Sequence, residues 1–149
     1  YGLKRVYKNA VHCFFAEPTL CPSVLLGFAT NLYEAVNVHD FGIDGLTEAD
    51  GKARDIPVKV GKCTLFANAR TMIAGTGRSF MKVVAHAQTG VLLGAQLMCE
   101  HATDMIGQLS QAIANGMTAR QLLAAMRPHP TFEEALGEAL EELVAKLPE

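Results

Sequence analysis

The stretch SFMKVVAHAQTGVLLGAQLMC, from Ser79 to Cys99, decides the fold of this chain. Two runs rich in Val, Leu and Met, residues 79–85 and 91–99, flank the short segment His86–Gly90. Such runs favour β-strands, and Gly90 can adopt the positive φ that a tight connection between antiparallel strands requires. The sequence therefore predicts an antiparallel β-hairpin.

A third strand is predicted before the hairpin, over residues 58–65. Val58 and Val60 alternate with lysines, and Cys63 and Leu65 then continue the alternation on the opposite parity. A β-bulge near Gly61 would account for this change, because one extra residue moves every later side chain to the other face of the strand. We therefore expect at least three antiparallel strands.

The first 44 residues give no comparable signal. Their apolar residues keep neither the period of a strand nor that of a helix for long, and prolines and glycines interrupt them. Within one compact domain overall, we treat residues 1–44 as an N-terminal segment of uncertain structure and residues 45–149 as the principal unit. That unit begins with a predicted short helix, Glu48–Asp55, which Thr47 and Asp50 would cap.

Downstream of the hairpin the apolar residues take a helical period. One stripe runs from Ala102 to Ile113 and stops before Gly116, and Thr118 starts a capping box for a second, shorter helix. A final helix, Thr131–Leu147, has apolar residues on one face and glutamates on the other. Strands followed by helices predict an α+β fold, in which an antiparallel sheet has helices packed on one face.

Composition excludes several classes of protein. Of the 149 residues, 50% are hydrophobic and 19% are charged, which suits a chain that folds around a core. The longest apolar run, residues 24–29, is far shorter than the roughly 20 residues that cross a bilayer. The net charge is −2, whereas a domain that binds nucleic acid usually carries an excess of positive charge. We expect neither a membrane nor a nucleic-acid partner, and the start at Tyr1 suggests part of a longer gene product.

The cysteines and most histidines show no ligand pattern. We expect the four cysteines to be reduced, buried thiols of a cytoplasmic protein, since they form neither C-x-x-C nor a paired zinc spacing: Cys13, Cys21, Cys63 and Cys99. Four histidines lie in different segments without the spacing of metal ligands: His12, His39, His86 and His101. No metal site is expected.

The segment Pro128-His129-Pro130 is the best candidate for chemistry. Pro130 disfavours a helical conformation at His129, so the imidazole lies on a stiff elbow between two predicted helices. Histidine moves protons near neutral pH when a partner fixes its tautomer. Glu134, which lies in the first turn of the last helix, could accept a hydrogen bond from one ring nitrogen and leave the other free.

Glu134 has a second possible role. Thr131-x-x-Glu134 has the spacing of a capping box, in which the Glu134 carboxylate accepts from the backbone N–H of Thr131. Spacing alone favours this cap over a His129–Glu134 pair, and the two roles would compete for one carboxylate. His129 could also be an ordinary surface residue of a loop.

The segment 45–149 resembles the C-terminal interface (dimerisation) domain of the pyridine nucleotide–disulfide oxidoreductases, and most closely that of dihydrolipoamide dehydrogenases. The resemblance is most specific at His129–Glu134. The other matching segments follow in the same order as in the family: Gly45–Glu48, Phe66–Arg70, Gly77–Val84, Thr89–Ala95 and Ala102–Ile106.

The resemblance implies roles for the elbow. His129 would be the acid/base of dithiol–disulfide exchange, Glu134 would orient it, and the His129–Pro130 bond would be cis and lie close to the FAD of the other subunit. It also implies a homodimer, FAD and NAD held by domains outside this chain, and a lipoyl-bearing acyltransferase or carrier as a possible partner. The chain lacks the family's redox disulfide, so we do not expect it to be active alone.

Two departures from the family pattern are visible. Arg127 stands where many relatives carry a second histidine, and residues 1–44 lack the usual first-strand motif, so the first strand is uncertain. An alternative remains open, a free-standing homo-oligomerisation module without catalysis. In that module the apolar stripes Ala102–Ile113 and Phe132–Leu147 would serve self-association.

Overall fold

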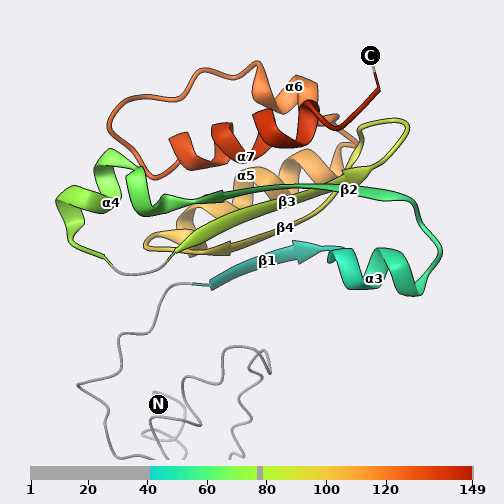
Figure 1. Cartoon of the computed structure of the whole chain (residues 1–149), viewed down its shortest axis with the longest axis horizontal. Coiled ribbons are helices and arrows are strands. Elements are labelled where there is room, and N and C mark those ends of the chain that lie inside the picture. Colours follow the sequence, from blue (N-terminus) through green and yellow to red (C-terminus); the bar gives the residue numbers. More distant parts are fainter. Residues whose placement is uncertain (1–40, 77–78, 149) are drawn as a thin grey trace, which may run out of the picture. The chain divides into compact units, whose positions relative to one another are not determined.

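The computed structural model describes residues 41–76 and 79–148 (Figure 1). They form a four-stranded antiparallel sheet in the order β1-β4-β3-β2. The strands are β1 (Phe41–Gly45), β2 (Val58–Thr64), β3 (Phe80–His86) and β4 (Leu92–Met98). The predictions for Cys13, Cys21, His12 and His39 lie outside the described residues.

The predicted hairpin is β3–β4, and Gly90 in its connection has a φ of 69°. The sheet also contains β1, which lies where the sequence left the structure open and pairs with β4 from Phe41–Met98 to Gly45–Gly94. This pairing places β4 between two neighbours, so Gln96 and Leu97 belong to an inner strand. Both are buried.

The bulge predicted near Gly61 is wrong. β2 pairs with β3 in continuous register, and the irregularity lies instead between β3 and β4, at Val84 and Ala85. The change of parity in β2 arises because its two faces contact different helices. Gly61 lies against α7 (Glu134–Val144), whereas Val58, on the other face, lies against Gly51 of α3 (Glu48–Ala53).

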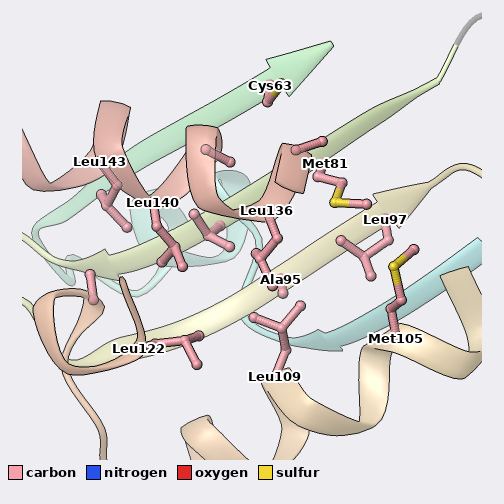
Figure 2. Close-up of a cluster of buried hydrophobic side chains, with 14 of the residues drawn as sticks. Cys63, Met81, Ala95, Leu97, Met105, Leu109, Leu122, Leu136, Leu140 and Leu143 are labelled. Atoms are coloured by element: carbon pink, nitrogen blue, oxygen red, sulfur yellow. The ribbon is translucent and has the colours of Figure 1, made fainter. Parts of the chain in front are cut away.

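The main helices cover one face of the sheet, as predicted for an α+β fold. Helix α7 packs on β2 and β3, α5 (Ala102–Ala114) packs on β1 and β4, and α6 (Ala119–Leu123) packs on α7 (Figure 1). Figure 2 shows the resulting core, in which sheet residues meet leucines of α5, α6 and α7: Met81, Ala95, Leu97, Leu109, Leu122, Leu136, Leu140 and Leu143. No helix among residues 41–76 and 79–148 is long and apolar enough to cross a membrane.

The two apolar stripes that could have served self-association are therefore buried inside the domain. The stripe of α7 includes Leu136, Leu140 and Leu143, each at most 1% exposed, and Leu109 of α5 is also 1% exposed. Large apolar side chains that do reach solvent lie elsewhere. Phe66 is 91% exposed, and Met72 and Ile73 are 69% and 66% exposed.

Helix capping follows the sequence at α3 and α6. Thr47 and Asp50 form the predicted capping box of α3, although this helix ends at Ala53 and not at Asp55. Thr118 and Gln121 form the same motif at α6. Two short helices between β2 and β3 were not predicted, a 3₁₀ helix η2 (Leu65–Ala67) and α4 (Ala69–Ala74). The sequence predicts Leu65 as the last residue of the strand that begins at Val58, whereas the structure places it in η2.

The glutamate face of α7 protects the edge strand β2. Glu142 Oε2 accepts from the backbone N–H of Lys62 at 2.7 Å, and Lys146 Nζ donates to the carbonyl oxygen of Val60 at 2.8 Å. Unpaired backbone groups on an edge strand can pair with other chains, and covering them with side chains prevents this. Glu142 and Lys146 therefore cover backbone groups of the edge strand as well as facing solvent.

Helix α7 approaches β2 so closely that only glycine fits between them at residue 61. A Cβ on Gly61 would overlap the carbonyl oxygen of Ala139 and would lie 2.7 Å from Cβ of Leu143. Relief would require the backbone of α7 to move, because neither obstacle is the end of a flexible side chain. The position of α7 on the sheet therefore depends on this glycine.

We predict that Gly61→Ala lowers the free energy of unfolding by about 2–3 kcal/mol, because it overpacks the contact between α7 and β2. Gly107→Ala is the matched control, since a Cβ there meets nothing within 4 Å. It should raise the free energy of unfolding by about 0.5–1 kcal/mol, the usual gain for alanine over glycine in a helix. Denaturant titration measures both values, and equal stability of the two variants would contradict the close approach.

Candidate functional site

The elbow between α6 and α7 carries the candidate site. Its residues Pro128, His129 and Pro130 are exposed, and the His129–Pro130 peptide bond is cis, as the resemblance implies. Helix α7 begins at Glu134 and not at Thr131. The hydroxyl of Thr131 donates to the carbonyl oxygen of Pro128 at 2.8 Å, so it belongs to the elbow and does not cap the helix.

Glu134 has both of the partners that the sequence offered it. Its Oε1 lies 2.7 Å from Nδ1 of His129, and its Oε2 accepts from the backbone N–H of Thr131 at 2.8 Å. The predicted competition between these roles is wrong, because each carboxylate oxygen has its own donor. The side chain of Glu134 is 28% exposed and that of His129 is 71% exposed.

Hydrogen bonding keeps Glu134 ionised. The backbone N–H of Thr131 is the main cause of a lowered pKa for this carboxyl, and the hydrogen bond from His129 lowers it further, while partial burial opposes both. An ionised carboxylate only accepts hydrogen bonds, so Nδ1 of His129 must be the donor. In the neutral ring, Nε2 then has no proton and is free to accept one.

Two side chains outside the elbow hold its ends. Arg127 donates to the carbonyl oxygens of Leu122 and Ala125 at 3.2 and 3.0 Å, so the residue that replaces a family histidine ties the start of the elbow to α6. Asn68, the N-cap of α4, donates from Nδ2 to the carbonyl oxygen of Thr131 at 2.9 Å. Sequence reasoning missed Asn68, although it lies within the matching segment Phe66–Arg70.

The other histidines of the described residues lie elsewhere. Nδ1 of His86 accepts from backbone N–H groups of Gln88 and Thr89 within the hairpin. His101 precedes α5 with a φ of 60°, and its Nδ1 lies 2.9 Å from Oδ2 of Asp104. Within residues 41–76 and 79–148, no three His, Cys, Asp or Glu side chains are placed to hold a metal ion.

Cys63 is a protected thiol. It is buried between β2 and α7, and its Sγ donates to Oε2 of Glu138 at 2.9 Å. Burial, followed by this hydrogen bond to Glu138, raises the pKa of Cys63 to about 12. The thiolate is the reactive form of cysteine, so this thiol is unsuited to disulfide exchange. Cys99 is also buried.

A large hollow of the described residues does not contain the elbow. It has a volume of about 1130 Å³ and lies beside α4, at the ends of β2 and β3. Apolar groups dominate its lining, which includes Phe66, Met72, Phe80 and Met98. His129 and Glu134 do not line it, and the three residues of the elbow are exposed.

A comparison with known protein families places the domain in one of them. Residues 39–140 match the pyridine nucleotide-disulphide oxidoreductase dimerisation domain. The chain belongs to this family. Both the α+β fold and the family expected from the sequence are thereby confirmed.

Solved structures of other proteins share the fold. LpdA from Mycobacterium tuberculosis superposes with a TM-score of 0.67 at 21% identity, over 70% of this chain and 23% of LpdA. The HOCl-induced flavoprotein disulfide reductase RclA from Escherichia coli gives a TM-score of 0.62 at 21% identity, over 72% of this chain and 24% of RclA. This dimerisation domain therefore spans about a quarter of those chains.

A second group of relatives shares a shorter segment. A probable D-serine dehydratase from Carboxydothermus hydrogenoformans is 48% identical over 60 residues, which are 40% of this chain and 14% of that protein. Another from Bacillus cereus is 57% identical over 53 residues, 36% of this chain and 12% of that protein. The chain spans only about an eighth of the length of these dehydratases.

We predict that Glu134→Gln lowers stability in a pH-dependent way. Because folding lowers the pKa of Glu134, its ionised form stabilises the fold above the usual glutamate pKa, and this contribution is lost as the pH falls through the lowered pKa of the folded state. The difference in unfolding free energy between wild type and Glu134→Gln should therefore be constant near neutrality and shrink in acid. Urea titrations at several pH values measure it.

Glu141→Gln provides the control for this series, since Glu141 is an exposed glutamate of the same helix. A pH dependence of equal size in both variants would mean that the Thr131 and His129 contacts of Glu134 do not carry the effect.

Proposed function

We propose that this chain is the dimerisation domain of a flavoprotein disulfide oxidoreductase of the dihydrolipoamide dehydrogenase type, to which it supplies an acid/base histidine. The observation that carries the proposal is the contact between His129 and Glu134. The carboxylate holds one ring nitrogen at 2.7 Å while 71% of the imidazole side chain remains exposed. An oriented ring with an accessible Nε2 is what proton transfer to a second molecule requires.

The proton transfer can be written from the residues of this chain. Nε2 of neutral His129 accepts the proton of a substrate thiol, and the substrate sulfur becomes a thiolate. The ring is then an imidazolium whose Nδ1–H still donates to Glu134, and the negative charge of Glu134 stabilises it. The thiolate is left to attack a disulfide that another part of the full protein provides.

FAD and NAD are the cofactors we propose for the full-length protein. The elbow fits a cofactor that approaches from outside the domain, because His129 and Pro130 are exposed. These two residues would contact the FAD of the partner subunit. The flavin supplies the oxidation–reduction chemistry when bound, and His129 handles only the proton.

We propose a homodimer as the working assembly, a lipoyl-bearing acyltransferase or carrier protein as a possible partner, and a reducing, cytoplasmic location. The exposed apolar side chains Phe66, Met72 and Ile73 support an assembly in which further protein covers this domain. The buried thiol Cys63, whose Sγ donates to Glu138, supports a reducing location. The same exposed surface would also serve a free-standing oligomerisation module.

We predict that His129→Gln lowers the turnover of dihydrolipoamide on the order of 10²–10⁴-fold when this domain is joined to the FAD and NAD domains of a dihydrolipoamide dehydrogenase, because glutamine cannot accept the proton. His101→Gln is the matched control, since His101 also pairs with a carboxylate, Asp104, but lies outside the elbow. Steady-state kinetics of NADH formation measures both.

Near-normal turnover by His129→Gln would overturn the acid/base role. Self-association of the chain, measured by sedimentation, together with full activity of His129→Gln would favour the oligomerisation module instead.

A further inference from the structure

Asn68 joins two parts of the chain that are 63 residues apart. Its Oδ1 accepts from the backbone N–H and from the hydroxyl of Thr71, at 3.0 and 3.1 Å. Because the backbone N–H of Thr71 can only donate, it fixes which end of the amide is the oxygen, and Nδ2 points at the carbonyl oxygen of Thr131, 2.9 Å away. Asn68 is only 7% exposed, so the donor side chain of this hydrogen bond is buried.

The hydrogen bond reaches the elbow through Thr131. The carbonyl group of Thr131 is held by Asn68, and its N–H donates to Oε2 of Glu134 at 2.8 Å. Both peptide groups that flank this residue are therefore fixed. The other oxygen of Glu134 holds Nδ1 of His129. A continuous series of hydrogen bonds thus runs from a buried side chain to an imidazole that is 71% exposed.

Capping of α4 does not explain why residue 68 carries an amide. A cap requires one side-chain oxygen, and serine or aspartate provides it as well as asparagine does. The Nδ2 group is the part that capping leaves unused, and it is the part that contacts Thr131. Its function must therefore be sought at the elbow.

We propose that Asn68 is a positioning residue: through Thr131 and Glu134 it holds the imidazole of His129 in the single tautomer that leaves Nε2 free. Arg127 ties the start of the elbow to α6, and Asn68 ties its end to α4. The importance of this tautomer for proton transfer rests on the proposed function. The way in which Asn68, Thr131 and Glu134 hold the imidazole is a property of this chain and can be tested without catalysis.

The test compares Asn68→Ser with Thr71→Val in the full 149-residue chain. Serine keeps an oxygen that can cap α4 but is too short to reach Thr131. Valine removes the hydroxyl that donates to Asn68 and leaves the Asn68–Thr131 hydrogen bond in place, so it weakens the same helix start without freeing the elbow. Nitrogen-15 NMR of the neutral imidazole reports the tautomer of His129. The resonance that disappears in His129→Gln is thereby assigned to His129. Hydrogen exchange reports the Thr131 amide.

In the wild type and in Thr71→Val we expect a single tautomer with the proton on Nδ1. In Asn68→Ser we expect a mixture of both tautomers and about fivefold faster exchange of the Thr131 amide, the change that corresponds to one lost hydrogen bond. Should Asn68→Ser fail to fold, Asn68→Asp, which keeps the shape and the capping oxygen but lacks the donor, is measured in the same way.

Unchanged tautomer and exchange in Asn68→Ser would overturn the proposal, as would an equal change in Thr71→Val or a mixture of tautomers in the wild type. These outcomes are independent of the proposed function. A normal turnover of His129→Gln would remove the acid/base role and leave the tautomer measurements unaffected.

Discussion

The close contact of α7 with the backbone of β2 is the constraint on which the rest of the domain depends. At Gly61 the strand has no side chain, and the backbone of α7 at Ala139 and Leu143 occupies the space. This contact places the leucines of α7 over the sheet and its glutamates beside the edge strand, where Glu142 and Lys146 bind backbone groups of β2. It also fixes the first turn of α7, and with it Glu134.

The elbow shows how an exposed side chain can be held in place by buried groups. Proline restricts the backbone on either side of His129, but it does not set the rotation of the imidazole. That rotation is set by Glu134, whose two oxygens take two different donors, and behind Glu134 by the contact between Thr131 and Asn68. The order of decreasing burial is Asn68, Glu134 and His129.

The surface of the domain is divided between two regions with different chemistry. The elbow carries an exposed imidazole held by a carboxylate, whereas the exposed apolar side chains Phe66, Met72 and Ile73 lie on η2 and α4. The amphipathic stripes of α5 and α7 contribute to neither region, because the sheet already covers them. Periodicity identifies an apolar face but does not say whether the sheet or another molecule covers it.

The sequence by itself determined the elements whose signals are local: the β3–β4 hairpin, the capped helices α3 and α6, and the amphipathic helices α5 and α7. Each of these depends on residues close together along the chain. Only the tertiary structure decided that Phe41–Gly45 joins the sheet beside β4, that the change of parity in β2 reflects two different neighbours, and that Asn68 holds Thr131. Each of these features is a contact between segments that are far apart in the sequence. Local preferences do not specify such contacts, which form only when the core assembles.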